Sequence, residues 1–489
     1  MVVGLINYLK IPPIQAAAAG ALIGFYVLFR MHFLFVIIFL SLIFISFNLF
    51  FVLASLNTAS RRLHLISIYS IVITAGIFAG LFAAYEGRSN VYFSIPENSV
   101  TGIEGRLLDD PRIVSGGNMI AVVSMYTASG KDGLRVSSRG EVSVFFSQEN
   151  AQKIREFGRG TVIYIEGIPG YSGYGWSVNA QSVHIVKPAS VIEQKRTSIR
   201  LSLINRFSKE DFGGMSLILL LGIRDNLDSS LLSLYREAGL SYILALSGMH
   251  LAIFAALISF VLRKPLGLKG CAIAGSVFIF LYCLLTGPMP SLYRAAFMYF
   301  LGVAAIIGGF PKKTMSILSV SFLFQLIITP AAGNSISFIL SYLALAGILL
   351  TGFSLSSLLA GKIPDFLLQP LSISAGAFLA TAGVCSFVFG MIAPMGIITS
   401  LVIVPLTAVF MTGSILWLLF DFFSISAFLN PLLSFLYWIM EKITSLAGII
   451  PGISVNPYLI LIFSLGLSLW IIIMEYNRRM KLLKLQLFD

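Results

Sequence analysis

The sequence predicts an all-α polytopic membrane bundle with an inserted small β-barrel domain of the OB type. The 489 residues are 57% hydrophobic and only 11% charged, whereas charged residues are roughly a quarter of a soluble protein. Apolar runs such as residues 33–53 and 63–84 have about the 20 residues that a helix needs to cross a bilayer. Allowing that length per span, we expect about ten to twelve spans and one re-entrant segment.

Residues 86–199 differ from the rest of the chain, because they combine mixed charge, glycine-rich turns and short alternating apolar runs. That pattern is typical of β-strands. Five strands with a helix at 148–157 between the third and fourth indicate an OB-type barrel, with an unclassified β-sandwich as the alternative. The expected strands are 101–108, 119–127, 140–146, 161–167 and 176–186.

Lysine and arginine mark the cytoplasmic loops of membrane proteins. Arg61 and Arg62 place their loop inside, so the span 63–84 carries the chain outward and the β domain lies outside the membrane. Arg263, Lys264 and Lys269 mark a further inside loop between two spans, and the basic C-terminus also lies inside. The net charge of +12 is attributed mainly to this topology rather than to nucleic-acid binding. We expect no cleaved signal peptide, because the first apolar run at 14–29 leads into a second one without a cleavage site.

The apolar stretch 212–222 is too short to span the membrane, and the polar residues Arg224, Asp225 and Asp228 follow it. It is either re-entrant beside a water-filled cavity or an interfacial amphipathic segment. Both interpretations stay open at this point.

The sequence SGMH puts Ser247, Gly248 and His250 inside an otherwise apolar segment. Ionisable residues at membrane depth usually face a bundle interior or an aqueous path. His250 is therefore a candidate functional residue, and the alternative is a histidine that packs between helices.

A second polar feature lies at residues 285–296, LTGPMPSLYRAA. Gly287, Pro288 and Pro290 break the helix, and Arg294 brings a charge to membrane depth. Broken helices often border binding sites, although Arg294 could instead snorkel to the outer interface. In a third segment, residues 330–348, small and hydroxyl side chains favour helix packing over a path lining.

In the β domain, basic and aromatic residues are candidates for weak contacts with a nucleic-acid strand. The competing interpretation is that the aromatic residues fill a barrel core and that interspersed acids cancel the basic charge. The candidates are Arg135, Arg139, Lys153, Arg155, Arg159, Tyr174 and Trp176.

Catalytic and metal-binding signatures are sparse in the sequence. It contains no Walker phosphate loop, HExxH, paired-cysteine metal motif or GxSxG elbow, so we expect no enzyme activity, cofactor or metal. A hydrolase that uses Ser247 and His250 is an alternative, but no orienting acid is evident near them.

Residues 219–254, LLLGIRDNLDSSLLSLYREAGLSYILALSGMHLAIF, resemble the signature of the ComEC family of competence proteins. Residues 285–298 and 335–348 are similar to the second and third signatures of that family, in the same order. By position, the resemblance assigns Ser247, Gly248 and His250 to the first signature and Arg224, Asp225 and Asp228 to its polar lead-in. Its second signature contains Gly287, Pro290, Ser291 and Arg294.

The resemblance implies a channel that admits single-stranded DNA across the cytoplasmic membrane during natural transformation. It implies four parts: N-terminal transmembrane helices (1–85), the extracytoplasmic OB-like domain (86–199), a competence-type channel domain (200–475) and a basic cytoplasmic tail (476–489). Implied partners are single-stranded DNA, membrane lipid, and a separate DNA receptor, helicase or other motor, and nuclease. The oligomeric state cannot be read from the sequence.

The sequence departs from the family pattern at Tyr242, where histidine is common, and at Ser400, where asparagine is common. Many longer relatives carry a C-terminal metallo-β-lactamase-like domain, which we expect this form to lack. A transporter or exporter of another anionic polymer or solute is the alternative from a different class.

Overall fold

The computed structural model describes residues 13–23, 25, 69, 72–77, 79–82, 91–114, 118–147, 154, 157–172, 175–225, 227–310, 313–450 and 452–486. The predicted N-terminal span 33–53, Arg61, Arg62 and most of the predicted helix 148–157 lie outside these residues. In the described N-terminal part, α2 (Pro13–Leu22) packs on α11 (Thr314–Ile328).

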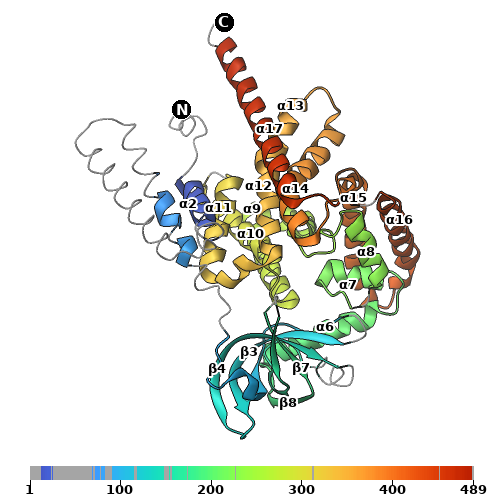
Figure 1. The fold of residues 1–489 in the computed structure, drawn as a ribbon. Coiled ribbons are helices and arrows are strands. Elements are labelled where there is room, and N and C mark those ends of the chain that lie inside the picture. Colours follow the sequence, from blue (N-terminus) through green and yellow to red (C-terminus); the bar gives the residue numbers. More distant parts are fainter. Residues whose placement is uncertain are drawn as a thin grey trace, which may run out of the picture.

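The chain forms a sheet domain at one end of a large helical domain (Figure 1). The strands of the sheet are β1 (Val100–Leu107), β2 (Arg112–Ile113), β3 (Met119–Gly130), β4 (Arg135–Phe146), β5 (Val162–Glu166), β6 (Pro169–Ser172), β7 (Gly175–Ala180) and β8 (Ser182–Lys187). Buried and exposed residues alternate along β3 and β4, because successive side chains of a strand point to opposite faces. This confirms a small β domain.

The closed barrel that we predicted is wrong. The described strands form an open sheet in the order β6-β7-β4-β3-β1-β5-β8, with β2 paired to β3. The expected strand 176–186 is divided at Gln181 into β7, which pairs in parallel with β4, and β8, which pairs with β5. These two strands therefore lie near opposite ends of the sheet, and no pairing joins the end strands β6 and β8 among the described residues.

The helical domain begins with α6 (Val191–Phe207), which runs between the sheet and the other helices (Figure 1). The predicted domain boundary at 199 falls inside this helix. The helices that follow are α7 (Gly213–Leu221), α8 (Ser229–Glu237), α9 (Gly248–Thr286), α10 (Pro290–Gly308), α11, α12 (Ile336–Gly347), α13 (Phe353–Leu359), α14 (Asp365–Phe389), α15 (Met395–Asp421), α16 (Asn430–Gly448) and α17 (Pro457–Gln486).

Helix α9 is a hairpin of two antiparallel helices rather than one rod. Gly267 has non-helical angles, φ 65° and ψ −175°, which glycine adopts readily. The Sγ of Cys271 lies 3.7 Å from the Oγ of Ser259, whereas twelve residues of straight helix would separate them by about 18 Å. The rings of Phe254 and Tyr282 are likewise 4.5 Å apart. The hairpin confirms the predicted pair of spans around the basic turn.

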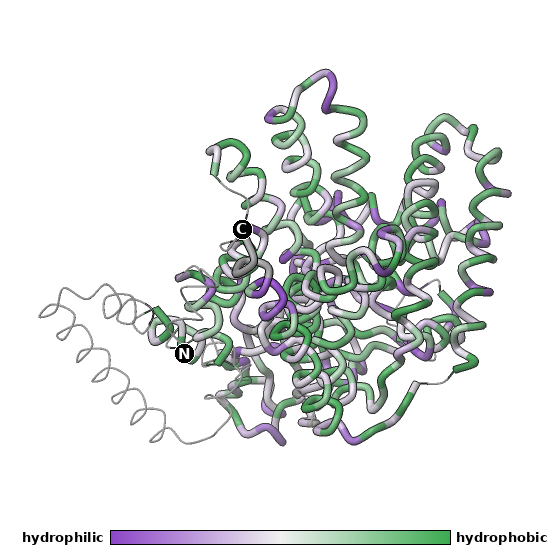
Figure 2. The backbone as a smooth tube through the Cα atoms, turned by 90° about the horizontal axis from the view of Figure 1, so that it is seen from above, coloured by the Kyte–Doolittle hydropathy of each residue, from purple (hydrophilic) through white to green (hydrophobic). Residues whose placement is uncertain are grey.

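Six helices of the described part are long and apolar enough to cross a membrane. They are α9, α10, α12 with its continuation to Leu359, α14, α15 and α17. Figure 2 shows hydrophobic residues along most of the helical part of the chain. The chain is therefore a multi-pass membrane protein, and the expected ten to twelve spans fall partly on residues outside the described set.

Helix α7 is the predicted short segment. Its nine residues are about 14 Å long, less than half the hydrocarbon thickness. It is buried along nearly its whole length, and the chain after it returns to the β domain, where Asp225 accepts a hydrogen bond from the Ile113 backbone N–H at 3.2 Å. Burial inside the protein agrees with the re-entrant interpretation, which stays a prediction.

Candidate functional site

The start of α9 is fixed by its own first residues. Ser247 is extended and precedes the helix, and its backbone N–H donates to His250 Nδ1 at 3.2 Å. The imidazole thus occupies the place of the glutamate or glutamine in a capping box. Because Nδ1 accepts this bond, the neutral ring carries its proton on Nε2. Nε2 is fully buried and has no hydrogen-bond partner among the described residues.

The break between α9 and α10 lies at Gly287, which has φ 88°, a conformation that disfavours a side chain. Pro290 then begins α10, where its missing N–H has no cost. The last carbonyls of α9 face two arginines of α6: Arg196 and Arg200 donate to Leu285 O at 3.2 and 3.1 Å. Cations at a helix C-terminus are stabilised by the helix dipole.

Arg294 lies one turn into α10 and is only 7% exposed, so it does not snorkel to the interface. Its Nε donates to Ser341 Oγ at 2.7 Å, and its guanidinium lies over the Tyr342 ring at 5.7 Å. Ser291 Oγ is 3.0 Å from the same Ser341 hydroxyl. No ion pair between described residues includes Arg294. A buried cation without a carboxylate is costly and is therefore a marker of function.

The two signatures meet at Gly248. A Cβ atom on Gly248 would lie 3.7 Å from Arg294 Nη2 and 3.6 Å from the Ala295 Cβ. Helix α7 reaches the α9–α10 break, since a Cβ on Gly222, the residue that ends α7, would lie 3.2 Å from the Met289 side chain. The fold thus gathers polar features that are distant in the sequence around one buried guanidinium.

Hydrogen bonds extend this site into α11 and α12. The Tyr342 hydroxyl donates to Gln325 Oε1 at 3.0 Å, and Gln325 Nε2 donates to the Pro290 carbonyl at 3.3 Å. The sequence favoured helix packing as the role of residues 330–348. Gly347 has that role, because an added Cβ would lie only 2.3 Å from the Gly376 carbonyl oxygen. Ser341 has a different role, since its hydroxyl accepts a hydrogen bond from Arg294. Tyr342 and Gln325 were missed, since apolar neighbours conceal single polar residues.

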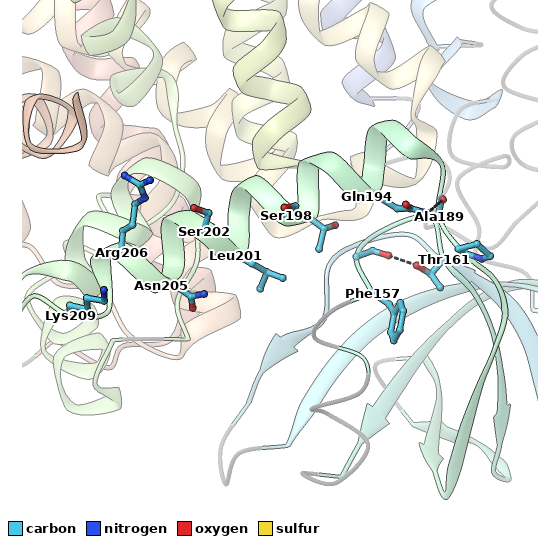
Figure 3. Close-up of a pocket in the computed structure, with 13 residues that line it drawn as sticks. Phe157, Thr161, Ala189, Gln194, Ser198, Leu201, Ser202, Asn205, Arg206 and Lys209 are labelled. Atoms are coloured by element: carbon cyan, nitrogen blue, oxygen red, sulfur yellow. Dashed lines mark hydrogen bonds between the residues drawn. The ribbon is translucent and has the colours of Figure 1, made fainter. Parts of the chain in front are cut away.

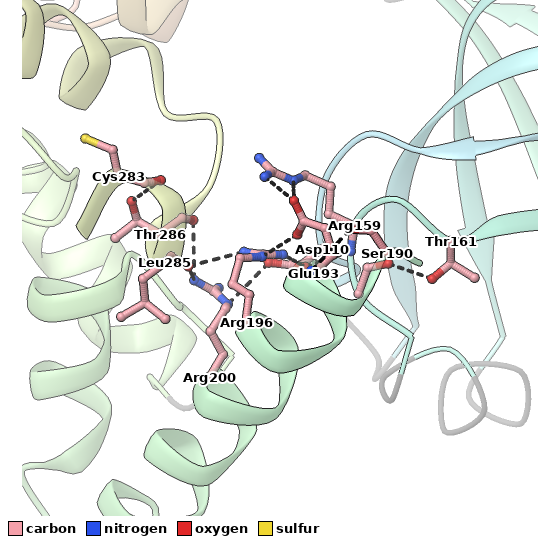
Figure 4. A network of polar contacts seen from close by, with 11 residues as sticks. Asp110, Arg159, Thr161, Ser190, Glu193, Arg196, Arg200, Cys283, Leu285 and Thr286 are labelled. Atoms are coloured by element: carbon pink, nitrogen blue, oxygen red, sulfur yellow. Dashed lines mark hydrogen bonds and ion pairs between the residues drawn. The ribbon is translucent and has the colours of Figure 1, made fainter. Parts of the chain in front are cut away.

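A second polar network joins the β domain to the membrane domain (Figure 4). Asp110 accepts from Arg196 Nη2, from Arg200 Nε at 3.2 Å and from the Arg159 backbone N–H at 3.0 Å. Glu193 pairs with Arg159 and with Arg196 Nε, the latter at 2.7 Å. This group, the docking network, holds the α9–α10 break beneath the sheet. The signal in the sequence was the helical spacing of Glu193, Arg196 and Arg200.

The charges of the docking network set its protonation. Burial raises the pKa of Asp110, but Arg200, Arg196 and the Arg159 N–H outweigh burial and hold it below its usual value. Burial lowers the pKa of Arg159, yet its bond to Glu193 gives a net increase. Burial lowers the pKa of Arg200. These groups are charged at neutral pH, since an aspartate with a lowered pKa stays ionised.

The polar lead-in lies apart from Gly248. Asp225 contacts the β domain, as described above. Arg224 is exposed, and burial of part of its side chain together with the charges of Arg112 and Arg236 lowers its pKa. Asp228 is also exposed and precedes α8. The lead-in thus connects α7 with the sheet.

The β-domain candidates do not form one patch among the described residues. Arg135 pairs with Glu104 at 2.9 Å and lies over the Tyr164 ring, and Arg139 is exposed. Arg159 belongs to the docking network, and Trp176 packs against Phe93 at 5.1 Å between ring centroids. Lys153, Arg155 and Tyr174 lie outside the described residues.

A cavity of about 800 Å³ lies between α6 and the β domain (Figure 3). Hydroxyl and amide side chains of α6 line one wall, with Arg206 and Lys209 at one end. Arg206 is paired with Asp421 at 2.8 Å. The cavity is thus a polar space at the junction of the two domains.

No group of three or more histidine, cysteine or acidic residues that could hold a metal occurs in the described part of the chain. The Ser247 Oγ lies 3.1 Å from His250 Nδ1. In a serine hydrolase, however, an acid binds the second ring nitrogen. The Nε2 of His250 has no partner in the described residues, so this contact has the geometry of a helix cap.

The fold and the site define a multi-pass membrane protein in which a short buried helix, a broken helix and a buried arginine lie next to a sheet domain. The family model described as Competence protein matches residues 219–479, which contain the helix break, Arg294 and the last residues of α7. The chain belongs to this family.

Among curated proteins, the chain is 23% identical over 320 residues to ComE operon protein 3 of Bacillus subtilis (strain 168). The match covers 62% of this chain and 40% of that protein. The chain thus matches less than half the length of this relative. No solved structure matches the chain.

Proposed function

We propose that the chain is a channel that takes up single-stranded DNA across the cytoplasmic membrane during natural transformation. The observation that carries the proposal is Arg294, a buried guanidinium that has no carboxylate partner among the described residues and lies beside the start of α9. Guanidinium groups form strong charge-assisted hydrogen bonds with phosphate oxygens. Family membership supports DNA as the transported polymer.

In this proposal, the β domain lies outside the membrane and the end of α17 lies in the cytoplasm. A strand passes the β domain, reaches the α9–α10 break and meets Arg294. The docking network fixes the break in position, and Ser341 and the Tyr342 ring hold the Arg294 guanidinium in place. The chain itself performs no catalysis. A DNA receptor, a motor and a nuclease are separate partners, and lipid surrounds the bundle.

The experiment compares cells in which the gene is deleted with cells that express wild type or the Arg294→Ala variant, with membrane levels equalised. We expect deletion to abolish incorporation of labelled DNA, wild type to restore it and Arg294→Ala to fail. Lys269→Ala is the control, because it removes a positive charge from the exposed turn of α9. Normal uptake by Arg294→Ala at equal level contradicts the assignment.

Two other functions are separated by the same strains. If deletion leaves DNA uptake unchanged, transport of another anionic polymer or solute becomes the better explanation. If Ser247→Ala abolishes DNA uptake and also abolishes formation of a hydrolytic product that wild type makes, the hydrolase interpretation replaces the channel. The cap geometry of Ser247 and His250 supports the channel.

A further inference from the structure

Two sources of positive potential meet at the N-terminus of α9. The first backbone N–H groups of a helix have no carbonyl partner within the helix, and the helix dipole gives that end a partial positive charge. The Nη2 of Arg294 points to the same end, 3.7 Å from where the Cβ of Gly248 would lie. The N-terminal end of α9 and the Arg294 guanidinium repel each other, and an anion between them would offset this repulsion.

Two donors at this place have no acceptor among the described residues. Arg294 uses Nε for Ser341 and Nη1 for the Met298 sulfur, and its Nη2 has no hydrogen-bond acceptor in the described part. On the first turn of α9, the fully buried His250 Nε2 is also without a partner among the described residues. Buried polar groups are nearly always hydrogen-bonded, so the unpartnered Nε2 is unusual, and Nη2 is free to donate to a further acceptor.

We propose that Arg294 Nη2 and the first-turn N–H groups of α9 bind one phosphate-type oxyanion, with the missing side chain of Gly248 providing the space. Helix N-termini and arginine guanidinium groups both bind phosphate in proteins. The inference rests on the proposed function for one point, the source of the phosphate, which is the backbone of the DNA strand. The site itself requires only the contacts above.

Glycine is essential to this arrangement for a reason other than its flexibility. An alanine at 248 would make only ordinary contacts of 3.6 and 3.7 Å, so the fold tolerates the methyl group. The methyl group would nevertheless occupy the space between the helix end and Nη2. A matched control lies on α10, where a Cβ on Gly302 meets no atom within 4 Å.

The test is equilibrium dialysis of labelled inorganic phosphate with the purified full chain in a maltoside detergent, at constant ionic strength. We expect one phosphate per chain for wild type and Gly302→Ala, and binding weaker by about tenfold or more for Gly248→Ala and Arg294→Gln. Displacement by a short oligothymidylate assigns the site to DNA, and displacement by phosphatidylglycerol assigns it to a lipid headgroup.

Equal phosphate binding by Gly248→Ala and wild type overturns the inference, provided that both unfold at the same temperature. Absence of phosphate binding to wild type also overturns it. The proposed function fails separately: if the variants lose phosphate binding but import DNA normally, the site exists and the DNA route lies elsewhere. If Arg294→Ala abolishes uptake while wild type binds no phosphate, the channel stands and the anion site does not.

Discussion

Replacement of Asp110 with asparagine should release the β domain from the membrane domain. The Asp110 carboxylate is 22% exposed and binds Arg196, whose side chain is 5% exposed, and Arg200. Removing one partner of a buried ion pair costs about 3 to 5 kcal/mol. Because Asp110 is partly exposed and Arg196 keeps Glu193, we expect a loss of about 2 to 3 kcal/mol in the free energy of unfolding.

The assay is denaturant unfolding of the full chain in detergent, arranged as a double-mutant cycle with Asp110→Asn and Arg200→Gln. A coupling energy of about 1 kcal/mol or more is expected for residues of one network. The control is Arg135→Gln, whose side chain is 57% exposed in its pair with Glu104, and which should cost no more than about 1 kcal/mol. Equal losses for Asp110→Asn and Arg135→Gln would refute the docking network.

Three further predictions follow from the same contacts. His250→Gln should retain the cap of α9, because glutamine can also accept the Ser247 N–H, whereas His250→Ala should lose about 1 kcal/mol of stability in the same unfolding assay. Gly347→Ala should separate α12 from α14, because the methyl group would lie 2.3 Å from the Gly376 carbonyl; a loss of about 1 to 3 kcal/mol is expected in that assay. Because the pKa of Asp110 is lowered in the folded state, its contribution is complete above the ordinary aspartate value of about 3.9 and is lost as the pH falls through the folded value. Unfolding between pH 7 and 3 should show this loss in wild type and not in Asp110→Asn.

The membrane class and the main elements could be predicted from the sequence because hydropathy and strand alternation are local signals. The span pair of α9 was found from its basic turn, and the short α7 from its length. Local signals could not show whether the sheet closes into a barrel. Whether residues 176–186 form one strand or the two strands β7 and β8 depends on pairing with distant strands, which the alternation of side chains does not encode.

The candidate site was only partly visible for a related reason. His250 and Arg294 stand out because ionisable residues are unusual at membrane depth, and Gly248 lies beside His250 in the same motif. Their meeting, however, depends on how α9 and α10 pack. Asp110 and Arg196 are 86 residues apart, and each resembles an ordinary surface charge in the sequence. Arg159 was predicted to contact DNA, but Glu193 already binds its guanidinium.

The central claim is that DNA passes the α9–α10 break beside Arg294. The most direct measurement places a photoreactive p-benzoylphenylalanine at Tyr293, which precedes Arg294 and is 37% exposed, and irradiates cells during uptake of labelled DNA. Phe280, 56% exposed on the apolar α9 hairpin, is the control. We predict DNA adducts at position 293 and none at 280. Adducts at neither position, or equally at both, in cells that import DNA normally would contradict the route.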